Sequence, residues 1–292
     1  MYAAIIKRTY AIALILIAIF SFASCSSQKD EDSENAEKLM TKIKSMYSGK
    51  KYDDALLLID SLMKTYPGLV EIQHRALHVQ TMITEKMALA DSIENEKEYS
   101  LNVAIADSVK QSLKFIKTKD MVEGFYVDAT ANDDGIPSST GVMPRVSANG
   151  ELSIISSLRG QNIRHTHLIA TANTVQAETL TIPVNNSRNY RYNDNGQNVE
   201  LVTFNGQECD SIVALIAQNR EKTITITFAG AKKSHKIKLS ESDKSAFANV
   251  YAYAQAITAI QKTEIDRIKF SKRLALARKQ IKQTATNIQG DR

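Results

Sequence analysis

Residues 69–116 read LVEIQHRALHVQTMITEKMALADSIENEKEYSLNVAIADSVKQSLKFI and contain neither proline nor glycine. Apolar or small residues recur along this stretch at spacings of three and four, which is the pattern of one face of an α-helix. The stretch predicts a single helix of about 48 residues, or about 70 Å, because each helical residue adds about 1.5 Å. The positions that carry the pattern are Ile72, Ala76, Val79, Ile83, Met87, Ala90, Ile93, Leu101, Ala104 and Ile116.

A second helical pattern of the same length runs from Ser242 to Ile288. Two long helices with this spacing predict an antiparallel coiled-coil stalk, in which residues near Ala90 pack against residues near Ile268. We expect polar residues near Lys97 and Gln261 in the same interface. The second pattern passes through Phe247, Val250, Ala254, Ile257, Ile268, Ala275, Ile281 and Ile288.

The charges of the two patterns support this pairing. Residues 85–98 carry a net charge of −3, and residues 262–273 carry a net charge of +3. If the two helices are antiparallel and are aligned from the end at which residues 121–239 connect them, these two segments lie opposite each other. Exposed ion pairs contribute under about 1 kcal/mol each, so the charges indicate register rather than stability. Two solvated faces with unrelated charges are the alternative interpretation.

Between the two patterns, residues 121–239 change to the alternation and turn chemistry of β-strands. A short helix is predicted at Asp210–Asn219. The predicted fold class is therefore α+β, with an antiparallel β-rich head at 118–240 inserted between the helices of the stalk. The β-rich runs are Leu152–Ile155, Ile163–Ala170, Thr179–Val184, Val199–Phe204, Thr223–Phe228 and Lys236–Leu239.

Two short helices around a Gly49 turn are predicted before the first long helix. Tyr52, Ala55 and Pro67 have the spacing of one tetratricopeptide repeat. Because such repeats need about three copies to bury a continuous core, one copy indicates a helical hairpin that packs on another element. The hairpin and the first stalk helix then occupy 36–117, and the returning stalk helix occupies 241–292.

The first 24 residues have the features of a secretion signal. Lys7 and Arg8 precede an apolar run from Ala11 to Phe20, which is shorter than the roughly 20 residues that a helix needs to span a bilayer. The sequence predicts a signal peptide at 1–24 and an acidic, flexible tether at 25–35.

Phe22-Ala23-Ser24-Cys25 resembles the lipobox of bacterial lipoproteins, with Phe22 in place of the usual leucine. The resemblance implies cleavage before Cys25 and lipidation of its thiol and amine, which would anchor the protein to a membrane. The run Ser26–Asp32 resembles the acidic export signal of surface lipoproteins in Bacteroidetes-type bacteria, and a solvated tether is its alternative interpretation. Ser26 after the cysteine favours the outer membrane by the same analogy.

Most of residues 118–260 resembles uncharacterised lipoproteins of Bacteroidetes-type bacteria. In those proteins a β-rich insertion is followed by a strand, a Leu-Ser-x-x-Asp-Lys cap and a long helix, and here the cap is Leu239–Lys244. The resemblance implies this architecture and a location at the bacterial outer membrane, either exposed at the cell surface or facing the periplasm. It implies no catalytic residue.

Composition and motifs argue against several functions. The 292 residues are 43% apolar, and the formal net charge falls from +5 to +3 without Lys7 and Arg8, which argues against nucleic-acid binding. The sequence has no nucleophile elbow and no phosphate-binding loop, and Ser61–Lys64 matches the Ser-x-x-Lys of penicillin-recognising enzymes without the companion motifs. Cys209 lies in an apolar-patterned stretch that predicts a buried, inert thiol. We expect no enzymatic activity and no cofactor.

Three groups of residues are weak candidates for metal binding. His165 and His167 would lie on one face of a strand, about 7 Å apart, but no nearby carboxylate or further histidine completes the site. His74 and His78 are one helical turn apart without an evident third ligand. Asp128–Gly135 resembles a calcium loop but lacks the glycine and the glutamate that such a loop requires. A strand surface, a polar helix stripe and a plain loop are the alternative interpretations.

Two groups of residues are candidate contact surfaces. Tyr190 and Tyr192, on either side of Arg191, lie on one strand face and are suited to stack on a ligand or anchor a partner. A basic run on the returning helix is suited to anionic head groups or lipopolysaccharide phosphates. Ordinary packing and a solvated helix face are the alternatives. The basic candidates are Lys272, Arg278, Lys279 and Lys282.

These observations leave two hypotheses for the function. The first is a non-enzymatic, lipid-anchored envelope protein whose stalk holds the head for contact with an envelope protein partner. The alternative is a ligand-binding lipoprotein whose head captures a glycan or a peptide. A concave, aromatic-lined pocket favours ligand capture, and a flat, exposed strand edge favours protein contact.

Overall fold

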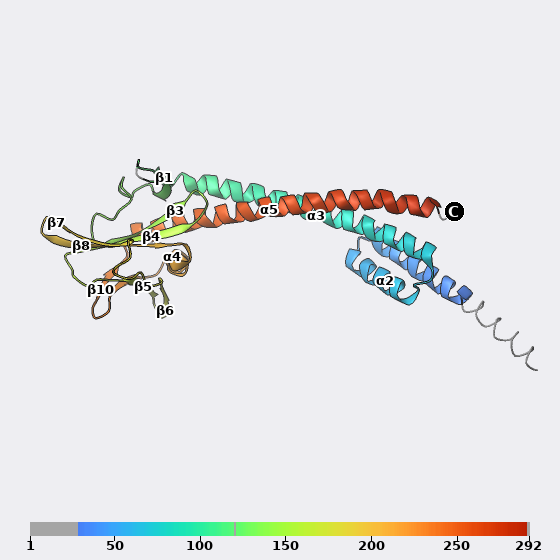
Figure 1. Cartoon of the computed structure of the whole chain (residues 1–292), viewed down its shortest axis with the longest axis horizontal. Coiled ribbons are helices and arrows are strands. Elements are labelled where there is room, and N and C mark those ends of the chain that lie inside the picture. Colours follow the sequence, from blue (N-terminus) through green and yellow to red (C-terminus); the bar gives the residue numbers. More distant parts are fainter. Residues whose placement is uncertain (1–28, 120, 291–292) are drawn as a thin grey trace, which may run out of the picture. The chain divides into compact units, whose positions relative to one another are not determined.

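The computed structural model describes residues 29–119 and 121–290 and has the predicted α+β fold (Figure 1). The chain divides into two units. Met1–Glu94 and Asp266–Arg292 form the first, which we call the helical unit, and Asn95–Ile265 form the second, which we call the β-rich unit. The predicted signal peptide and Cys25 lie outside the described residues. Among the described residues, no helix combines the length and the apolar character needed to cross a membrane.

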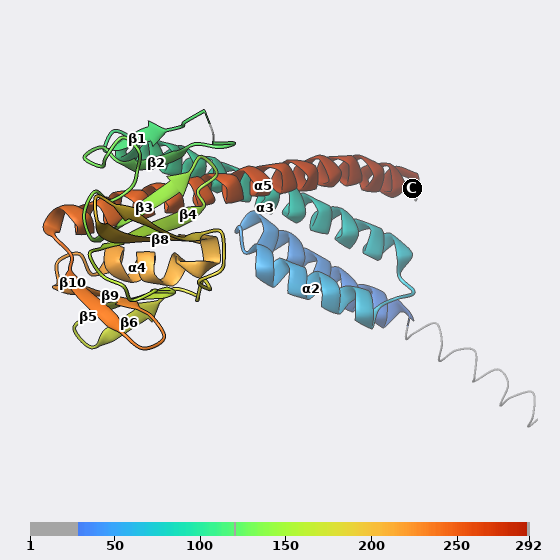
Figure 2. The ribbon, with the colours of Figure 1, turned by 60° about the vertical axis from the view of Figure 1, so that its left-hand side comes forward.

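The helical unit contains the predicted hairpin. A helix at 29–48 and α2 (Tyr52–Thr65) flank the turn at Gly49, and both pack with the first part of α3 (Val70–Lys110) (Figure 2). The hairpin therefore packs on another element, as predicted for a single repeat. Its core consists of Ala36, Met40, Ile43, Ala55, Ile59, Leu62, Ile72, Ala76, Val79 and Ile83.

The predicted tether at 25–35 is wrong for its described part, because residues 29–35 already belong to the first helix. Glu34 forms an ion pair with Lys38 one turn later, at 2.7 Å. Ala36 and Met40 are buried in the core and fix the helix to the hairpin.

In the helical unit, α3 runs antiparallel to the last part of α5 (Glu241–Gly290). Asp91 pairs with Arg273 and Glu85 pairs with Arg278, each at 3.1 Å. About two turns further, His78 Nδ1 lies 2.8 Å from Thr284 Oγ1. The predicted antiparallel pairing is therefore confirmed here, and the Asp91–Arg273 pair joins the two charged segments, whereas Arg278 lies beyond the predicted positive segment 262–273. In the β-rich unit the same two helices are joined by Asn95, whose side-chain amide donates to the Thr263 carbonyl at 2.9 Å.

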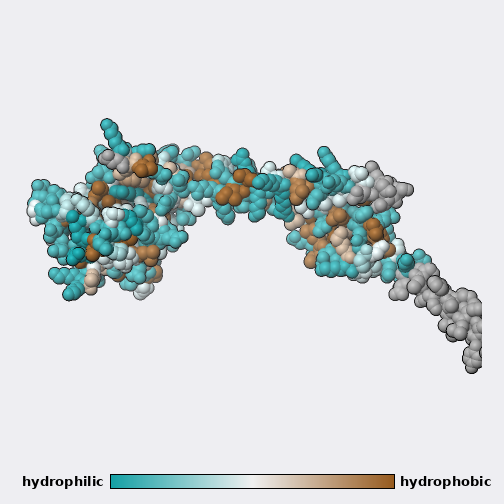
Figure 3. All heavy atoms as spheres, viewed as in Figure 1, coloured by the Kyte–Doolittle hydropathy of each residue, from teal (hydrophilic) through white to brown (hydrophobic). Residues whose placement is uncertain are grey.

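The predicted residues of the helix interface are wrong, however. Ile268 is 58% exposed, and Ala90, Lys97 and Gln261 are also exposed. The buried residues are small or polar, and small side chains let two helices approach closely. They are spaced by seven positions or by fourteen, as the facing positions of a coiled coil are. Apolar side chains outside this interface give hydrophobic spots on the helix surface (Figure 3). The buried positions include Thr81, Ala88 and Asn95 on α3, and Thr263, Ala277 and Thr284 on α5.

The two long helices also differ in length from the prediction. Helix α3 has 41 residues and ends at Lys110, and α5 has 50 residues. Residues Leu113 and Ile116, which the pattern assigned to the first helix and its segment 36–117, are instead buried in strand β1. The β-rich region therefore begins before the predicted boundary at 118. As a strand, Leu113–Ile116 buries the apolar side chains at both of its ends.

The β-rich unit contains two antiparallel sheets. The larger sheet has the strand order β1-β2-β3-β4-β8-β7, and the smaller has the order β10-β9-β5-β6. The predicted strand at Thr179–Val184 is wrong, and the predicted strand at Ile163–Ala170 begins only at His167. The bounds are β1 Leu113–Ile116, β2 Phe125–Asp128, β3 Gly141–Ser147, β4 Leu152–Arg159, β5 His167–Ala172, β6 Val175–Glu178, β7 Asn189–Asp194, β8 Gln197–Asn205, β9 Ile224–Ala229 and β10 Ser234–Lys238.

The core of the β-rich unit lies between its sheets. The predicted short helix, α4 (Asp210–Gln218), lies between them and buries Ile212, Val213 and Ile216 (Figure 2). The first turns of α5 add Phe247 and Val250 to the same core. This packing holds the loops between strands in fixed positions.

The helix interface predicts opposite results for two aspartate substitutions in α5. Ala277 is 1% exposed, so Ala277→Asp buries a carboxylate and should destabilise the helical unit by about 3 kcal/mol or more. The exposed Ile268 is the matched control, because Ile268→Asp leaves the carboxylate in water and should cost under about 1 kcal/mol. Urea unfolding followed by circular dichroism measures both. Equal losses in the two variants would contradict this interface.

Candidate functional site

A single carboxylate, that of Glu200 on β8, organises the segment that precedes β5. Its Oε1 accepts the backbone N–H groups of Ile163 at 2.9 Å and Arg164 at 2.6 Å. Its Oε2 accepts the backbone N–H of His165 at 2.8 Å and lies 2.7 Å from Nδ1 of the His165 ring. Three consecutive N–H groups that face one anion form a backbone nest. Glu200 therefore fixes both the backbone and one side chain of this segment.

The pKa values of this pair follow from their burial and their hydrogen bonds. Burial alone would raise the pKa of Glu200, but the hydrogen bonds from the His165 ring and from the backbone outweigh it and hold the pKa at about 2. Burial lowers the pKa of His165, against the opposing effect of Glu200. The ring is then neutral at pH 7, with Nδ1 donating to the ionised Glu200.

Ser156 on β4 completes a chain of three polar side chains. Its Oγ lies 2.8 Å from Nε2 of His165 and donates to it when the ring is neutral. A serine, a histidine and a carboxylate in this order are the arrangement that activates a nucleophile in hydrolases. Here Ser156 and His165 are completely buried, so the hydroxyl has no access to a substrate. The chain acts as a structural link between β4, β8 and the segment before β5.

The same contacts impose an uncommon backbone conformation on Arg164. Its φ is 59°, in the left-handed region that a residue with a side chain adopts at a cost of about 1 kcal/mol. The turn between β9 and β10 then comes very close, because a Cβ placed on Gly230 would lie 2.5 Å from the Ile163 carbonyl oxygen. Glycine is therefore required at 230 for the turn and the segment to touch.

A pocket of about 530 Å³ lies between this segment and the turn, and we call it the basic pocket. Arg164, Lys232, Lys233 and His167 contribute its basic groups, and among the described residues that line it none is acidic. The rest of the lining is largely apolar. The other lining residues are Asn162, Ile163, Thr166, Thr181, Val184, Gly230 and Ala231.

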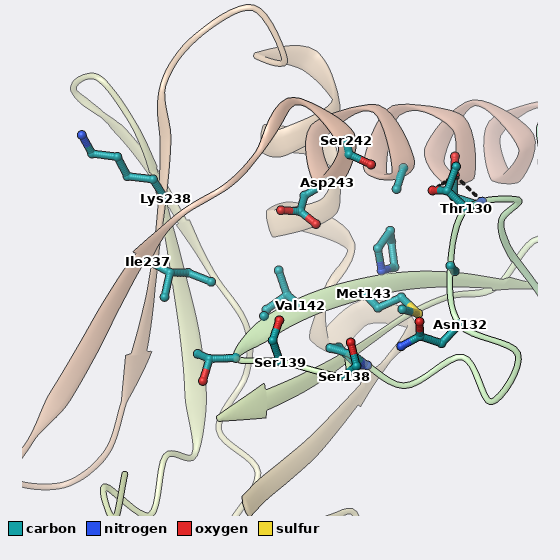
Figure 4. A pocket seen from close by; sticks show the side chains of 17 residues that line it. Thr130, Asn132, Ser138, Ser139, Val142, Met143, Ile237, Lys238, Ser242 and Asp243 are labelled. Atoms are coloured by element: carbon teal, nitrogen blue, oxygen red, sulfur yellow. Dashed lines mark hydrogen bonds between the residues drawn. The ribbon is translucent and has the colours of Figure 1, made fainter. Parts of the chain in front are cut away.

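A second pocket, of about 300 Å³, has the hydroxyl side chains of Thr130, Ser138, Ser139, Thr140 and Ser242 in its lining, together with apolar residues and Lys238. Figure 4 shows Ser138, Ser139 and Asn132 on one side and Asp243 of α5 on the other. Asp243 is occupied by the helix cap, because its Oδ2 accepts from Ser240 Oγ at 2.7 Å and from the Ser240 N–H at 3.0 Å. The predicted cap at Leu239–Lys244 is thus confirmed, and this pocket offers no free charged group from that helix.

The calcium-like loop Asp128–Gly135 lies beside this second pocket. Asp128 accepts hydrogen bonds from Thr130 and, through its other oxygen, from Asn249 at 2.9 Å. Asp133 pairs with Lys114 at 2.7 Å, and that lysine lowers the pKa of Asp133. Each carboxylate is therefore held by a protein donor of its own, and the loop does not gather its oxygens around one point.

The two histidines proposed as weak metal ligands lie in different surroundings. His165 is buried before β5 begins, whereas His167 is half-buried at the start of β5 and lines the basic pocket. The expectation that no carboxylate lies near His165 is wrong, because Glu200 binds it from 35 positions further along the chain. Among the described residues, no group of three or more histidine, cysteine or acidic side chains is arranged to hold a metal ion.

Tyr190 and Tyr192 lie on β7, the edge strand of the larger sheet, with their ring centroids 5.5 Å apart. Tyr190 is 60% exposed. Arg191 points elsewhere, with Nη1 donating to the Val184 carbonyl at 3.3 Å beside the basic pocket. The predicted pair of tyrosines on one strand face is therefore present, and Arg191 instead binds the backbone of Val184, one of the residues that line the pocket.

The remaining predicted residues lie in separate places. Cys209 is buried as predicted, and burial together with nearby acidic groups raises the pKa of its thiol to about 12. On α5, Arg278 pairs with Glu85, whereas Lys272, Lys279 and Lys282 are exposed. These three lysines stay a prediction for contact with head groups.

The sequence reasoning missed Glu200 and Ser156. Each alternates with apolar residues on the inward face of its strand, Ser156 between Ile154 and Leu158, and Glu200 two positions before Val202. A carboxylate at an inward position of a strand requires a buried partner. The inward position of Glu200 was therefore the one signal in the sequence that pointed to this site. It does not show which residue is the partner.

Comparison with known proteins adds no assignment. No protein-family model matches the chain, and no curated protein is similar enough to match it. The residues described above therefore carry the functional argument.

Glu200→Gln should destabilise the β-rich unit by about 3 kcal/mol at pH 7, because the amide turns a donor toward the backbone N–H groups and removes the charge. The pKa of Glu200 is about 2 in the folded state against an ordinary 4.5, so its contribution is complete above pH 4.5 and is lost as the pH falls toward 2. The difference between parent and variant should shrink over that range. Urea unfolding at pH 7, 4.5 and 3 measures it.

The exposed Glu178 on β6 provides the control for this test. Glu178→Gln should change the free energy of unfolding by under about 0.5 kcal/mol. A pH-independent difference for Glu200→Gln would show that its charge is not what holds the segment.

Proposed function

We propose that this protein is a non-enzymatic, lipid-anchored protein of the bacterial outer membrane that binds an envelope protein partner. The anchor would be attached at Cys25, on the strength of the preceding basic and apolar segments. Helices α3 and α5, which contribute residues to both units, would act as the stalk, and the β-rich unit would act as the head.

The observation that carries the proposal is the edge strand β7. No described strand pairs with its outer edge. At the start of β7 the Asn189 N–H donates to the Asn186 carbonyl and the Asn189 carbonyl accepts from Arg191, so the part of the edge after Asn189 is the part open to pairing with another chain. The exposed Tyr190 stacks on Tyr192, and two tyrosines in contact offer a rigid, partly apolar surface at a low entropy cost. An edge with these side chains is suited to protein contact.

A non-enzymatic role is preferred because the Ser156 hydroxyl is completely buried. The chain of Ser156, His165 and Glu200 is the nearest approach to a catalytic arrangement in the described residues, and it is fully buried. The hydrogen bonds of this chain serve to hold the segment before β5 in place.

Ligand capture by the head is the second candidate function, and the basic pocket favours it. The pocket is concave, but Tyr, Phe and Trp are missing from its described lining, which argues against stacking on a sugar ring. Of the two predicted ligand types, a peptide suits this lining better than a glycan.

The proposed contact predicts site-specific cross-linking in intact cells. A photo-reactive amino acid at the exposed position 193 of β7 should give one adduct of defined mass, and Tyr190→Ala should reduce its yield about tenfold, as expected for a central aromatic contact. The same photo-reactive group at Leu57, which is 70% exposed in the helical unit, is the control. Adducts that survive Tyr190→Ala, or that also form from position 57, would contradict the contact.

The anchor is tested in the same cells. Cys25→Ala should release the protein from the membrane fraction or leave an uncleaved precursor, and palmitate labelling should be lost. Unchanged labelling would show that the anchor is attached elsewhere, without affecting the result at β7.

A further inference from the structure

The basic pocket collects positive charge that the described chain does not neutralise. Arg164, Lys232 and Lys233 line it and are exposed. In the part of the chain that the structure describes, no carboxylate forms an ion pair with any of the three. Glu200, just behind the segment, keeps its charge, but its two oxygens accept from three backbone N–H groups and the His165 ring and from none of these basic side chains. The pocket is therefore complementary to an anion.

The apolar part of the lining restricts which anion fits. Ile163, Val184 and Ala231 are apolar residues of the lining. A small inorganic anion would leave this surface unused, whereas a ligand with an apolar group beside its charge would cover it. The volume of about 530 Å³ is within the range of sites for small ligands and chain ends.

The walls of the pocket are fixed by backbone hydrogen bonds. Thr166 N–H donates to the Ala229 carbonyl and Ile182 N–H donates to the Thr166 carbonyl, both at 2.8 Å. Gly230 N–H closes the turn by donating to the Lys233 carbonyl at 3.0 Å. A site with walls held in this way loses little entropy when a ligand binds.

We propose that the basic pocket binds a carboxylate attached to a short apolar group, the chemistry of the C-terminal residue of a peptide. The Arg164 guanidinium is the donor for the carboxylate, because its planar fork matches two carboxylate oxygens. Lys232 and Lys233 add charge at the rim, and Ile163 and Val184 contact the apolar group. This inference rests on the second candidate function, ligand capture, and names its ligand class; it is separate from the proposed contact at the β7 edge.

Ligand-observed NMR on the purified full chain in detergent tests the proposal. The probe is acetyl-Ala-Ala-Val with a free carboxylate, and saturation transfer should reach its valine methyl groups. The same peptide with a C-terminal amide should bind at least tenfold more weakly, since it lacks the charge. Isovalerate distinguishes a free organic acid from a chain end: comparable affinity supports the shared carboxylate chemistry, and weaker affinity assigns the site to peptides.

Matched variants locate the binding. Lys232→Gln combined with Lys233→Gln should weaken the peptide at least fivefold, and addition of Arg164→Gln should abolish detectable binding. Lys236→Gln, an exposed lysine of β10 outside the pocket, should leave binding unchanged. The lysine pair lies in an exposed turn, so it tests the site even where the Arg164 variant does not fold.

Three results would overturn the proposal. They are equal binding of the acid and the amide, equal binding by the parent and the lysine-pair variant, and displacement of the peptide by inorganic phosphate at equal concentration. The last result would indicate a general counter-ion effect. None of them bears on cross-linking at β7, so the two proposals fail independently.

Discussion

The carboxylate of Glu200 is the constraint on which the candidate sites of the β-rich unit depend. It replaces water for three consecutive backbone N–H groups and for the His165 ring, in a segment without regular secondary structure. A buried carboxylate without these partners would be strongly destabilising, and the segment without the carboxylate would leave its N–H groups unpaired. Each side of the contact therefore requires the other, and the left-handed conformation of Arg164 results from both.

The effects of this contact extend to the neighbouring surfaces. The fixed segment brings Ile163 against Gly230 and so forms one wall of the basic pocket. The His165 carbonyl accepts from Asn189 at the start of β7, at 3.3 Å, and this bond connects the segment to the edge strand that carries Tyr190. A partner at the edge and a ligand in the pocket would thus contact surfaces that share one buried support.

The long helices, the hairpin and the α+β class follow from the sequence, because they depend on spacing and on the placement of glycine and proline. The interface between α3 and α5 does not follow from the sequence. A pattern of apolar residues does not reveal it, because its buried positions are threonine, alanine and asparagine. Ile268 is apolar and exposed, whereas Thr284 is polar and buried beside His78. The site is harder still to predict from the sequence, because Ser156, His165 and Glu200 lie on three separate segments. The pairing of β4 with β8 places Ser156 and Glu200 in neighbouring strands, and the segment before β5 brings His165 to both.

Amide hydrogen exchange at Ile163, Arg164 and His165 tests the central role of Glu200 most directly. These residues lie outside the strands, where exchange is ordinarily fast. If the carboxylate holds their N–H groups, they should exchange as slowly as core amides of β4 and β8, and Glu200→Gln should speed their exchange at least a hundredfold. Exchange in the parent protein within about tenfold of an unfolded peptide would contradict the account, because the segment would then open without unfolding the sheet.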